Sequence, residues 1–317
     1  MTGPYGGALS VLEVVAPVFL LVAAGYVLAR TKVVSAEAVD GVMAFAVRFA
    51  VPLLLFGAIY RLDLASAFDL ELLASFYLGA LICFALAILL ARKVWGRRPG
   101  EAVAIGFCAL FSNSLLLGLP IMTRAYGEGA LAPNFAIISV HAPFCYLVGI
   151  VVMEFSRRDG AGLVATVTRA SKAMFSNALT IGLAAGFALN LGEVAVPAFA
   201  MTAVDMAATA ALPAALFGLG GALTRYSLRA DIGVATMTAA ISLVVHPALA
   251  LGLGAFVFDL PEGSLRAAVV TAAMPTGLNG YLFAAMYARA QGAAASVVLL
   301  GTAASVVTIT LWLLALG

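Results

Sequence analysis

The sequence predicts an all-α polytopic membrane protein with ten transmembrane helices, arranged as two five-helix inverted repeats with broken, crossing helices 4 and 9. Three observations lead to this prediction. Hydrophobic residues make up 64% of the 317 positions and charged residues only 10%, whereas a soluble domain carries about 25% charged residues. Apolar runs long enough to cross a membrane recur along the chain, and two short motifs occur twice at one constant spacing.

A membrane-spanning helix needs roughly 20 mostly apolar residues, and ten segments of the chain meet that requirement. Short polar links join them, so consecutive segments are expected to run antiparallel. The first run is longer than the core of a signal peptide, and we expect it to be retained as a span. The ten segments are 9–29, 38–60, 71–91, 101–126, 131–155, 174–191, 196–223, 231–258, 264–288 and 294–316.

The basic residues predict how the chain is inserted. Thirteen Lys and Arg residues fall in links on the side opposite the termini, and three, Arg61, Arg124 and Arg266, fall on the terminal side. Since basic loops stay in the cytoplasm, both termini are expected in the periplasm of a bacterial inner membrane protein. The basic link 92–100 is interpreted as a topology determinant that contacts anionic lipid. Nucleic-acid binding is not expected of so short a run.

Two matched pairs of motifs indicate an internal repeat. "AAGYVL" at 23–28 resembles "AAGFAL" at 184–189, and "VPLLLFG" at 51–57 resembles "LPAALFG" at 212–218. Both pairs are offset by 161 residues, which equates the first and second segments with the sixth and seventh. A second copy of five spans is inserted upside down relative to the first, a pattern that recurs in secondary transporters.

The fourth and ninth segments each contain a polar interruption, "FSNSLLLGLPIM" at 111–122 and "AAMPTGLNGYLF" at 272–283. Proline removes a backbone donor, and unpaired backbone groups persist in a membrane only around a protein-lined cavity. Two matched breaks therefore predict a substrate site at mid-depth, where half-helix N-termini favour an anion. Asn113 is expected to contact the substrate and Pro120 to hold the helix open. The predicted substrate-binding residues are Asn113, Ser114, Gly118, Pro120, Pro275, Thr276, Gly277 and Asn279.

Four ionisable residues inside the predicted spans are candidates for charge balance or coupling. Arg48 and Asp205 lie in the second and seventh segments. They are expected either to pair with each other or to lend the anion site positive potential through Arg48. The alternative is that one or both lie in a water-filled crevice or at the depth of the lipid headgroups. His141 and His246 lie just before prolines, and each acts either as a proton carrier or as a hydrogen-bonding group within the kink.

Other classes of protein have little support. Cys83, Cys108 and Cys145 lack paired spacing and are interpreted as buried apolar residues, and with two isolated histidines neither a metal site nor a cofactor is expected. "GLGGAL" at 218–223 follows no predicted strand, which excludes a dinucleotide loop. The histidines have no acidic partner at helical spacing, so the protein is not expected to be an enzyme. A channel is the alternative with less support, because the spans show no continuous polar stripe.

The two interruptions resemble those of a known family. "NSLLLGLPI" at 113–121 resembles the fourth-span signature of the auxin efflux carrier family, which includes plant PIN-FORMED carriers and bacterial malate permeases. "MPTGLNGYLFAAMY" at 274–287 resembles the ninth-span element of the same family. The resemblance covers nearly the whole chain. The central link of this chain has about 17 residues, where plant carriers have a long hydrophilic loop. This difference weighs against plant-type regulation and against auxin as the substrate.

The resemblance implies a fold similar to bile acid–sodium symporters. A scaffold domain, 1–61 and 174–226, would be dimeric, and a transport domain, 62–173 and 227–317, would hold the crossing helices and move as an elevator. The expected function is secondary transport of a small organic anion, an auxin-like or malate-like carboxylate, by alternating access. The expected partners are this anion, the lipid bilayer and a second copy in a homodimer, with H⁺ or Na⁺ as candidate coupling ions. The alternatives are an ion- or solute-conducting channel and a Na⁺-coupled carrier like the bile acid–sodium symporters.

Overall fold

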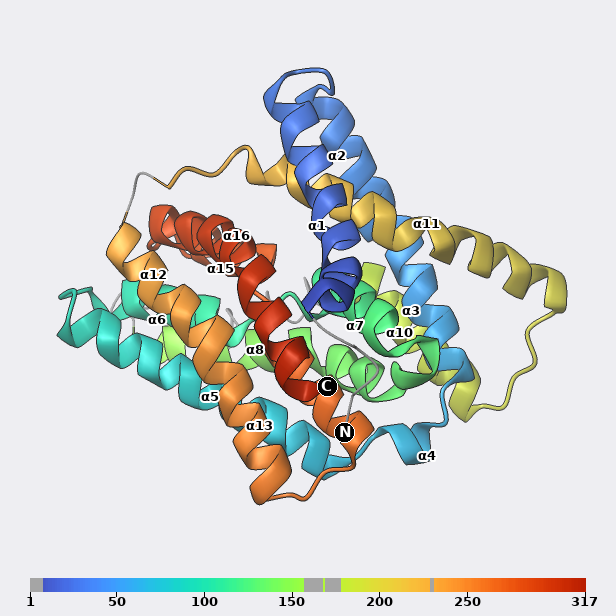
Figure 1. Cartoon of the computed structure of the whole chain (residues 1–317). Helices are drawn as coiled ribbons and strands as arrows, with labels where there is room; N and C mark the ends of the chain where they lie inside the picture. Colours follow the sequence, from blue (N-terminus) through green and yellow to red (C-terminus); the bar gives the residue numbers. More distant parts are fainter. Residues whose placement is uncertain (1–7, 157–167, 169–177, 229–230) are drawn as a thin grey trace. The chain divides into compact units, whose positions relative to one another are not determined.

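The computed structural model describes residues 8–156, 168, 178–228 and 231–317, and this part of the chain is helical, with one isolated β-bridge as its extended pairing (Figure 1). Seven of the described helical stretches are long and apolar enough to cross a membrane. The predicted class, an all-α polytopic membrane protein, is therefore confirmed.

The other three predicted segments are not single long helices. Two of them, 101–126 and 264–288, are each divided into separate helices by a break. The third contains α10 (Ala178–Leu191), and its residues 174–177 lie outside the described part, as does most of the central link. The count of ten spans therefore stays a prediction.

The described residues form two compact units. The first contains residues 8–16, 68–156 and 226–317 apart from 229–230, and the second contains residues 17–67 and 178–225. The helices of the first unit, after the opening turns of α1 (Ala8–Arg30), are α5 (Leu70–Lys93), α6 (Pro99–Leu110), η2 (Ser114–Gly118), α7 (Leu119–Tyr126), η3 (Glu128–Ala130), α8 (Ala132–Ser156), α12 (Ile232–Ala240), η4 (Ile241–Val245), α13 (His246–Phe256), α14 (Glu262–Ala272), α15 (Leu278–Met286) and α16 (Gln291–Leu316).

The core of the first unit lies around the helices that flank the breaks. Phe107 of α6 and Phe283 of α15 are fully buried, and their rings stack with centroids 3.9 Å apart. Gly149 of α8 makes room for this pair, because a Cβ there would lie 2.5 Å from the Phe107 ring. Close packing of this kind fixes α6, α8 and α15 against one another.

The second unit contains the remainder of α1 together with α2 (Ala36–Phe45), η1 (Ala46–Ala50), α3 (Val51–Arg61), α4 (Leu64–Ala67), α10 and α11 (Ala198–Leu223). Its helices approach each other through glycine. A Cβ on Gly25 would lie 2.0 Å from the carbonyl oxygen of Phe217, and a Cβ on Gly186 would lie 2.9 Å from that of Phe56. Both contacts require glycine because a side chain would collide with backbone.

These two glycine contacts are related by the spacing of the predicted repeat. Gly25 and Gly186 are 161 residues apart, and so are Phe56 and Phe217. Gly25 lies against Phe217 and Gly186 lies against Phe56, so each contact joins the two predicted copies. A reciprocal pair of this kind is what two copies related by a two-fold axis would make.

Three short π-helical turns share one cause. η1, η2 and η4 each end two residues before a proline, Pro52, Pro120 and Pro247 respectively. Proline has no N–H, and its ring pushes away the carbonyl four residues earlier. The preceding N–H then reaches one residue further back: Val51 donates to Ala46, and His246 donates to Ile241. Widened turns of this type are frequent at functional sites.

Pro17 interrupts the hydrogen bonding of α1, and an arginine compensates for it. Pro17 cannot donate to the carbonyl of Glu13. The guanidinium of Arg124, on α7, donates instead, through Nη2 to Glu13 O at 2.8 Å and through Nε to Val14 O at 3.0 Å. These bonds tie the start of α1 to the first unit, whose boundary falls between Ala16 and Pro17.

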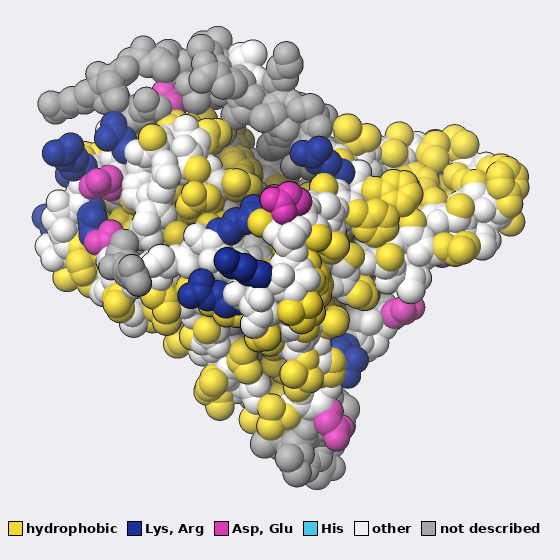
Figure 2. Space-filling model, turned by 90° about the horizontal axis from the view of Figure 1, so that it is seen from above, with side chains coloured by type: hydrophobic (Ala, Val, Ile, Leu, Met, Phe, Trp, Pro, Cys, Tyr) yellow, Lys and Arg dark blue, Asp and Glu magenta, His cyan; other side chains and the backbone are white. Residues whose placement is uncertain are grey.

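On the face shown in Figure 2, apolar side chains cover much of the surface, while Lys and Arg gather in a few places. Large apolar residues among the most exposed include Phe155, Phe199 and Phe256, each about four-fifths exposed or more. In a soluble protein such a surface would aggregate. Lipid contact accounts for it, in agreement with the seven membrane-length helices.

The close contact between α1 and α11 yields a test of the second unit. A Cβ on Gly220 would lie 1.9 Å from the carbonyl oxygen of Val22, so Gly220→Ala must separate the two helices. Overpacking costs about 1–3 kcal/mol, and the apparent melting temperature of the purified protein is expected to fall by about 3–10 °C.

Gly252→Ala is the matched control, because a Cβ on Gly252 of α13 meets nothing within 4 Å. Differential scanning fluorimetry measures both variants. Equal melting temperatures for the two would contradict the described contact of α1 with α11.

Candidate functional site

The two breaks cross each other inside the first unit. α6 ends at Leu110 and α14 ends at Ala272, and the extended residues that follow them pair in antiparallel fashion, with Ser112 opposite Thr276. The N–H of Asn113 donates to Pro275 O at 2.7 Å, and the N–H of Gly277 donates to Phe111 O at 3.2 Å. Each break therefore satisfies backbone groups that the other leaves open.

Two helix N-termini meet at this crossing. Asn113 is the N-cap of the helix that begins with η2, and Gly277 is the N-cap of α15. A Cβ on Gly277 would lie 3.6 Å from the Cα of Asn113, so the two caps lie next to each other. The Asn113 carbonyl accepts from the N–H groups of Leu117 and Gly118. The N–H groups before these, from Ser114 to Leu116, have no acceptor among the described residues, as is usual for a first turn.

Polar side chains surround the paired N-termini. Asn113 and Ser114 are nearly buried, and the amide of Asn113 forms no hydrogen bond with the part of the chain that is described. Asn279, in the first turn of α15, accepts at Oδ1 from the hydroxyl of Tyr146 at 3.1 Å. Its Nδ2 group is then left as a donor. Sequence reasoning found both asparagines but missed Tyr146 of α8, since nothing in the local sequence pairs residues 133 positions apart.

Two side chains hold the crossing strands in place. Thr276 donates from Oγ1 to Cys108 O at 2.5 Å, which satisfies a carbonyl in the last turn of α6. His141 Nε2 lies 3.2 Å from Ser112 O and, since a carbonyl only accepts, must be the donor. Thr276 and His141 are both buried. A Cβ on Gly280 would lie 2.6 Å from Thr276 Cγ2, so glycine gives the threonine its space.

The proline of the first interruption does not lie in the break. The break covers residues 111–113, whereas Pro120 lies in the first turn of α7, just beyond η2. Its expected role, holding the helix open at the break, is therefore wrong for this position. Pro120 widens the turn of η2 instead, and Gly118 lies in that turn, with Met274 Cγ 3.4 Å from where its Cβ would be. Pro275, in contrast, lies within the second break and pairs with Asn113.

Of the remaining ionisable candidates, Arg48 and Asp205 belong to the second unit and His246 to the first. The expected pair of Arg48 with Asp205 is wrong in its partner, because both oxygens of Asp205 accept from Arg61, at 2.9 and 2.8 Å. Arg48 is exposed in η1. His246 is buried and its Nε2 donates to Phe76 O at 3.2 Å. The cysteines are buried and free, which confirms their interpretation as apolar residues.

The chemistry available at the crossing is that of hydrogen-bond donors. Free N–H groups at two helix starts carry partial positive charge, and two asparagine amides add further donors. Such a set suits a carboxylate, the ligand that helix N-termini bind most readily along with phosphate. Among the described residues there is no group of three His, Cys, Asp or Glu that could hold a metal ion.

Known proteins resemble the chain over almost its full length. The family model described as "Membrane transport protein" matches residues 10–313. An "Uncharacterized transporter" of Methanothermobacter thermautotrophicus is 25% identical over 95% of this chain and 96% of its own length. A "Putative malonate transporter" of Rhizobium meliloti is 27% identical over 93% of this chain and 92% of its own length. The chain therefore belongs to the membrane transport protein family, the auxin efflux carrier family that the motifs at 113–121 and 274–287 indicated.

Proposed function

We propose that the protein is a secondary transporter of small organic anions, most suitably dicarboxylates, and that the anion binds at the crossing of the two breaks. The observation that carries this proposal is the position of the N-caps Asn113 and Gly277 next to each other, where two helix N-termini lie side by side among buried residues. The relative named as a malonate transporter supports the same class of substrate.

In this proposal the anion receives hydrogen bonds from both sides of the crossing. One carboxylate group binds the free N–H groups from Ser114 to Leu116 and the amide of Asn113. A second polar group binds Nδ2 of Asn279, which Tyr146 orients through its hydroxyl. The helix dipoles compensate the negative charge without a buried cation. Ser114, Gly118, Pro275, Thr276 and Gly277 shape the site around these donors.

The proposed framework is ten spans in two inverted five-span repeats. The reciprocal contacts of Gly25 with Phe217 and of Gly186 with Phe56 support the repeat. Residues 1–61 and 174–226 act as a dimeric scaffold, and residues 62–173 and 227–317 carry the substrate across the membrane as an elevator. The division of the described chain into two units, one of which holds the whole crossing, supports this assignment. The membrane is the bacterial inner membrane, with both termini outside.

Coupling to H⁺ or Na⁺ belongs to the same proposal. Of the two histidines, His141 is the better candidate for a proton carrier, since it donates to the crossing strand at Ser112. His246 bonds to Phe76 instead. Arg48 contributes positive potential only if an anion passes near η1. The carboxylate of Asp205 is already paired with Arg61, so we give Asp205 a structural role and not a role in coupling.

Removing the amide of Asn113 tests the site directly. A hydrogen bond to a charged group contributes about 1.5–3 kcal/mol, so Asn113→Ala is expected to raise the KM for radiolabelled malonate uptake into proteoliposomes by roughly 10- to 100-fold. Thr310→Ala is the control, because the Thr310 hydroxyl bonds only within its own helix, to Val306 O. An unchanged KM in Asn113→Ala would exclude the crossing as the substrate site.

The hydroxyl of Tyr146 is expected to matter through Asn279. Tyr146→Phe keeps the ring contacts with Phe107 and Phe111 but frees the amide to rotate, so the KM is expected to rise by about 3- to 10-fold with little change in melting temperature. Tyr60→Phe is the control, since it also loses the bonds of a hydroxyl, which donates to Val194 O and accepts from the N–H of Val196. If both variants transport equally well, Tyr146 has no role in orienting Asn279.

A carrier differs from a channel in its response to substrate on the far side of the membrane. Proteoliposomes loaded with unlabelled malonate are expected to take up labelled malonate faster than empty ones, because a loaded carrier returns more rapidly. Saturation with external substrate should accompany this effect. Uptake that neither saturates nor responds to internal malonate would favour the channel.

A further inference from the structure

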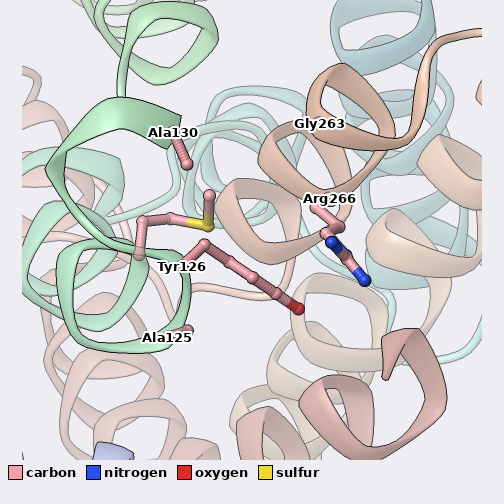
Figure 3. Close-up of a pocket in the computed structure, with 6 residues that line it drawn as sticks. Ala125, Tyr126, Ala130, Gly263 and Arg266 are labelled. Carbon is pink, nitrogen blue, oxygen red and sulfur yellow. The ribbon is translucent and has the colours of Figure 1, made fainter. Parts of the chain in front are cut away.

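A cavity of about 300 Å³ lies within the first unit, and no residue of the two breaks lines it (Figure 3). Its walls come from the two half-helices that flank the crossing and from η3. α7 leads away from the first break, and α14 leads into the second. The lining residues are Met122, Ala125, Tyr126, Ala130, Gly263 and Arg266.

Arg266 is the one charged residue of this lining. Its guanidinium lies over the ring of Tyr126, with Cζ 4.9 Å from the ring centroid, and the two side chains point toward one another in Figure 3. Nη2 also donates to Gly317 O at 3.0 Å and lies 2.5 Å from Glu262 Oε1. Stacking on an aromatic face holds the plane of a guanidinium and thus the direction of its donors.

The donors of Arg266 are not all used. A guanidinium has five N–H groups, and the bonds above involve Nη2 only. Its Nε is buried and has no hydrogen-bond partner in the described part of the chain. The Arg266 side chain is 22% exposed, whereas that of Glu262 is 72% exposed. An exposed carboxylate in a surface pair is weakly held, so Glu262 can move into solvent when another anion approaches.

We propose that this cavity is a second anion site, in which Arg266 binds the carboxylate of a small organic acid. The remainder of the ligand then lies against the apolar atoms of Met122, Ala125 and Ala130. The volume corresponds to about ten water molecules, which is enough for a short-chain mono- or dicarboxylate. The ligand class rests on the proposed function, but the site is separate from the crossing.

The position of the cavity connects it to the crossing. From Arg266 the helix α14 continues for six residues to Ala272, about 9 Å at 1.5 Å per residue, and the second break follows directly. A carboxylate held by Arg266 therefore lies close to the end of the helix pair that encloses the substrate. The second site collects the anion at one end of the path and raises its local concentration there.

Chemical labelling of the full-length purified protein tests this site. Ala125→Cys places a thiol in the lining, while the native Cys83, Cys108 and Cys145 are buried and form an unreactive background. The thiol is treated with the anionic sulfonatoethyl and the cationic aminoethyl methanethiosulfonates, and each rate is divided by the rate with free 2-mercaptoethanol. Sodium malonate is the probe for protection, with sodium chloride of equal ionic strength as its control.

The normalised rate is expected to be at least fivefold higher for the anionic reagent, and malonate is expected to slow both reagents. Arg266→Gln should abolish the preference and the protection. Arg225→Gln, which removes an exposed arginine paired with Asp40 in the second unit, should change neither. Absence of protection in Ala125→Cys with Arg266 intact would overturn the proposal, and this result does not depend on how well Arg266→Gln folds.

A further variant separates the two sites. Asn113→Ala combined with Ala125→Cys is expected to show the raised KM for malonate uptake but to keep protection of the thiol. If protection disappears with Asn113, malonate acts through the crossing and the second site is refuted. If protection persists while Asn113→Ala also transports normally, the second site stands and the proposed substrate site at the crossing fails.

Discussion

Two main-chain hydrogen bonds, from Asn113 to Pro275 and from Gly277 to Phe111, are the constraint on which the arrangement of the two broken helices depends. A helix interrupted in a bilayer leaves donors and acceptors unmet at a cost of several kcal/mol each. Here the two interruptions pair with each other, so most of that free-energy cost is avoided. The first N–H groups of the two helices still stay free. What stays unsatisfied is a set of N–H groups at the starts of two helices, and such groups carry partial positive charge.

The side chains around the crossing serve the same constraint. Thr276 and His141 each donate to a carbonyl that the break has freed, at Cys108 and Ser112. His141 thus uses Nε2 for a structural hydrogen bond to Ser112 O. A role as proton carrier would need the same nitrogen, so the two roles compete. The rings of Phe107 and Phe283 seal the inner face by stacking. The buried side of the crossing is therefore closed by hydrogen bonds and by ring stacking.

Much of this arrangement could be predicted from the sequence, and the failures have physical reasons. Composition and segment length predicted the fold class, and the polar interruptions predicted the regions of both breaks. The position of a break within its segment was not predictable, because Pro120 widens a turn and the chain opens seven residues earlier, at Asn113. Partners distant in sequence were also out of reach: Asp205 pairs with Arg61 because α3 and α11 pack together, and Tyr146 reaches Asn279 because α8 packs on α6 beside α15.

The bond between Arg124 and Glu13 has a consequence for how these residues tolerate change. Pro17 frees the Glu13 carbonyl, and Arg124 supplies the donor that the proline lacks. The Glu13 carbonyl keeps a donor without Arg124 only if residue 17 has an N–H. The two positions are therefore coupled, although they lie 107 residues apart. A chain that replaced Pro17 by alanine would be free to lose Arg124, whereas the reverse order of substitution would leave a bare carbonyl in an apolar helix. The order in which such changes can accumulate is thereby restricted by a single backbone oxygen.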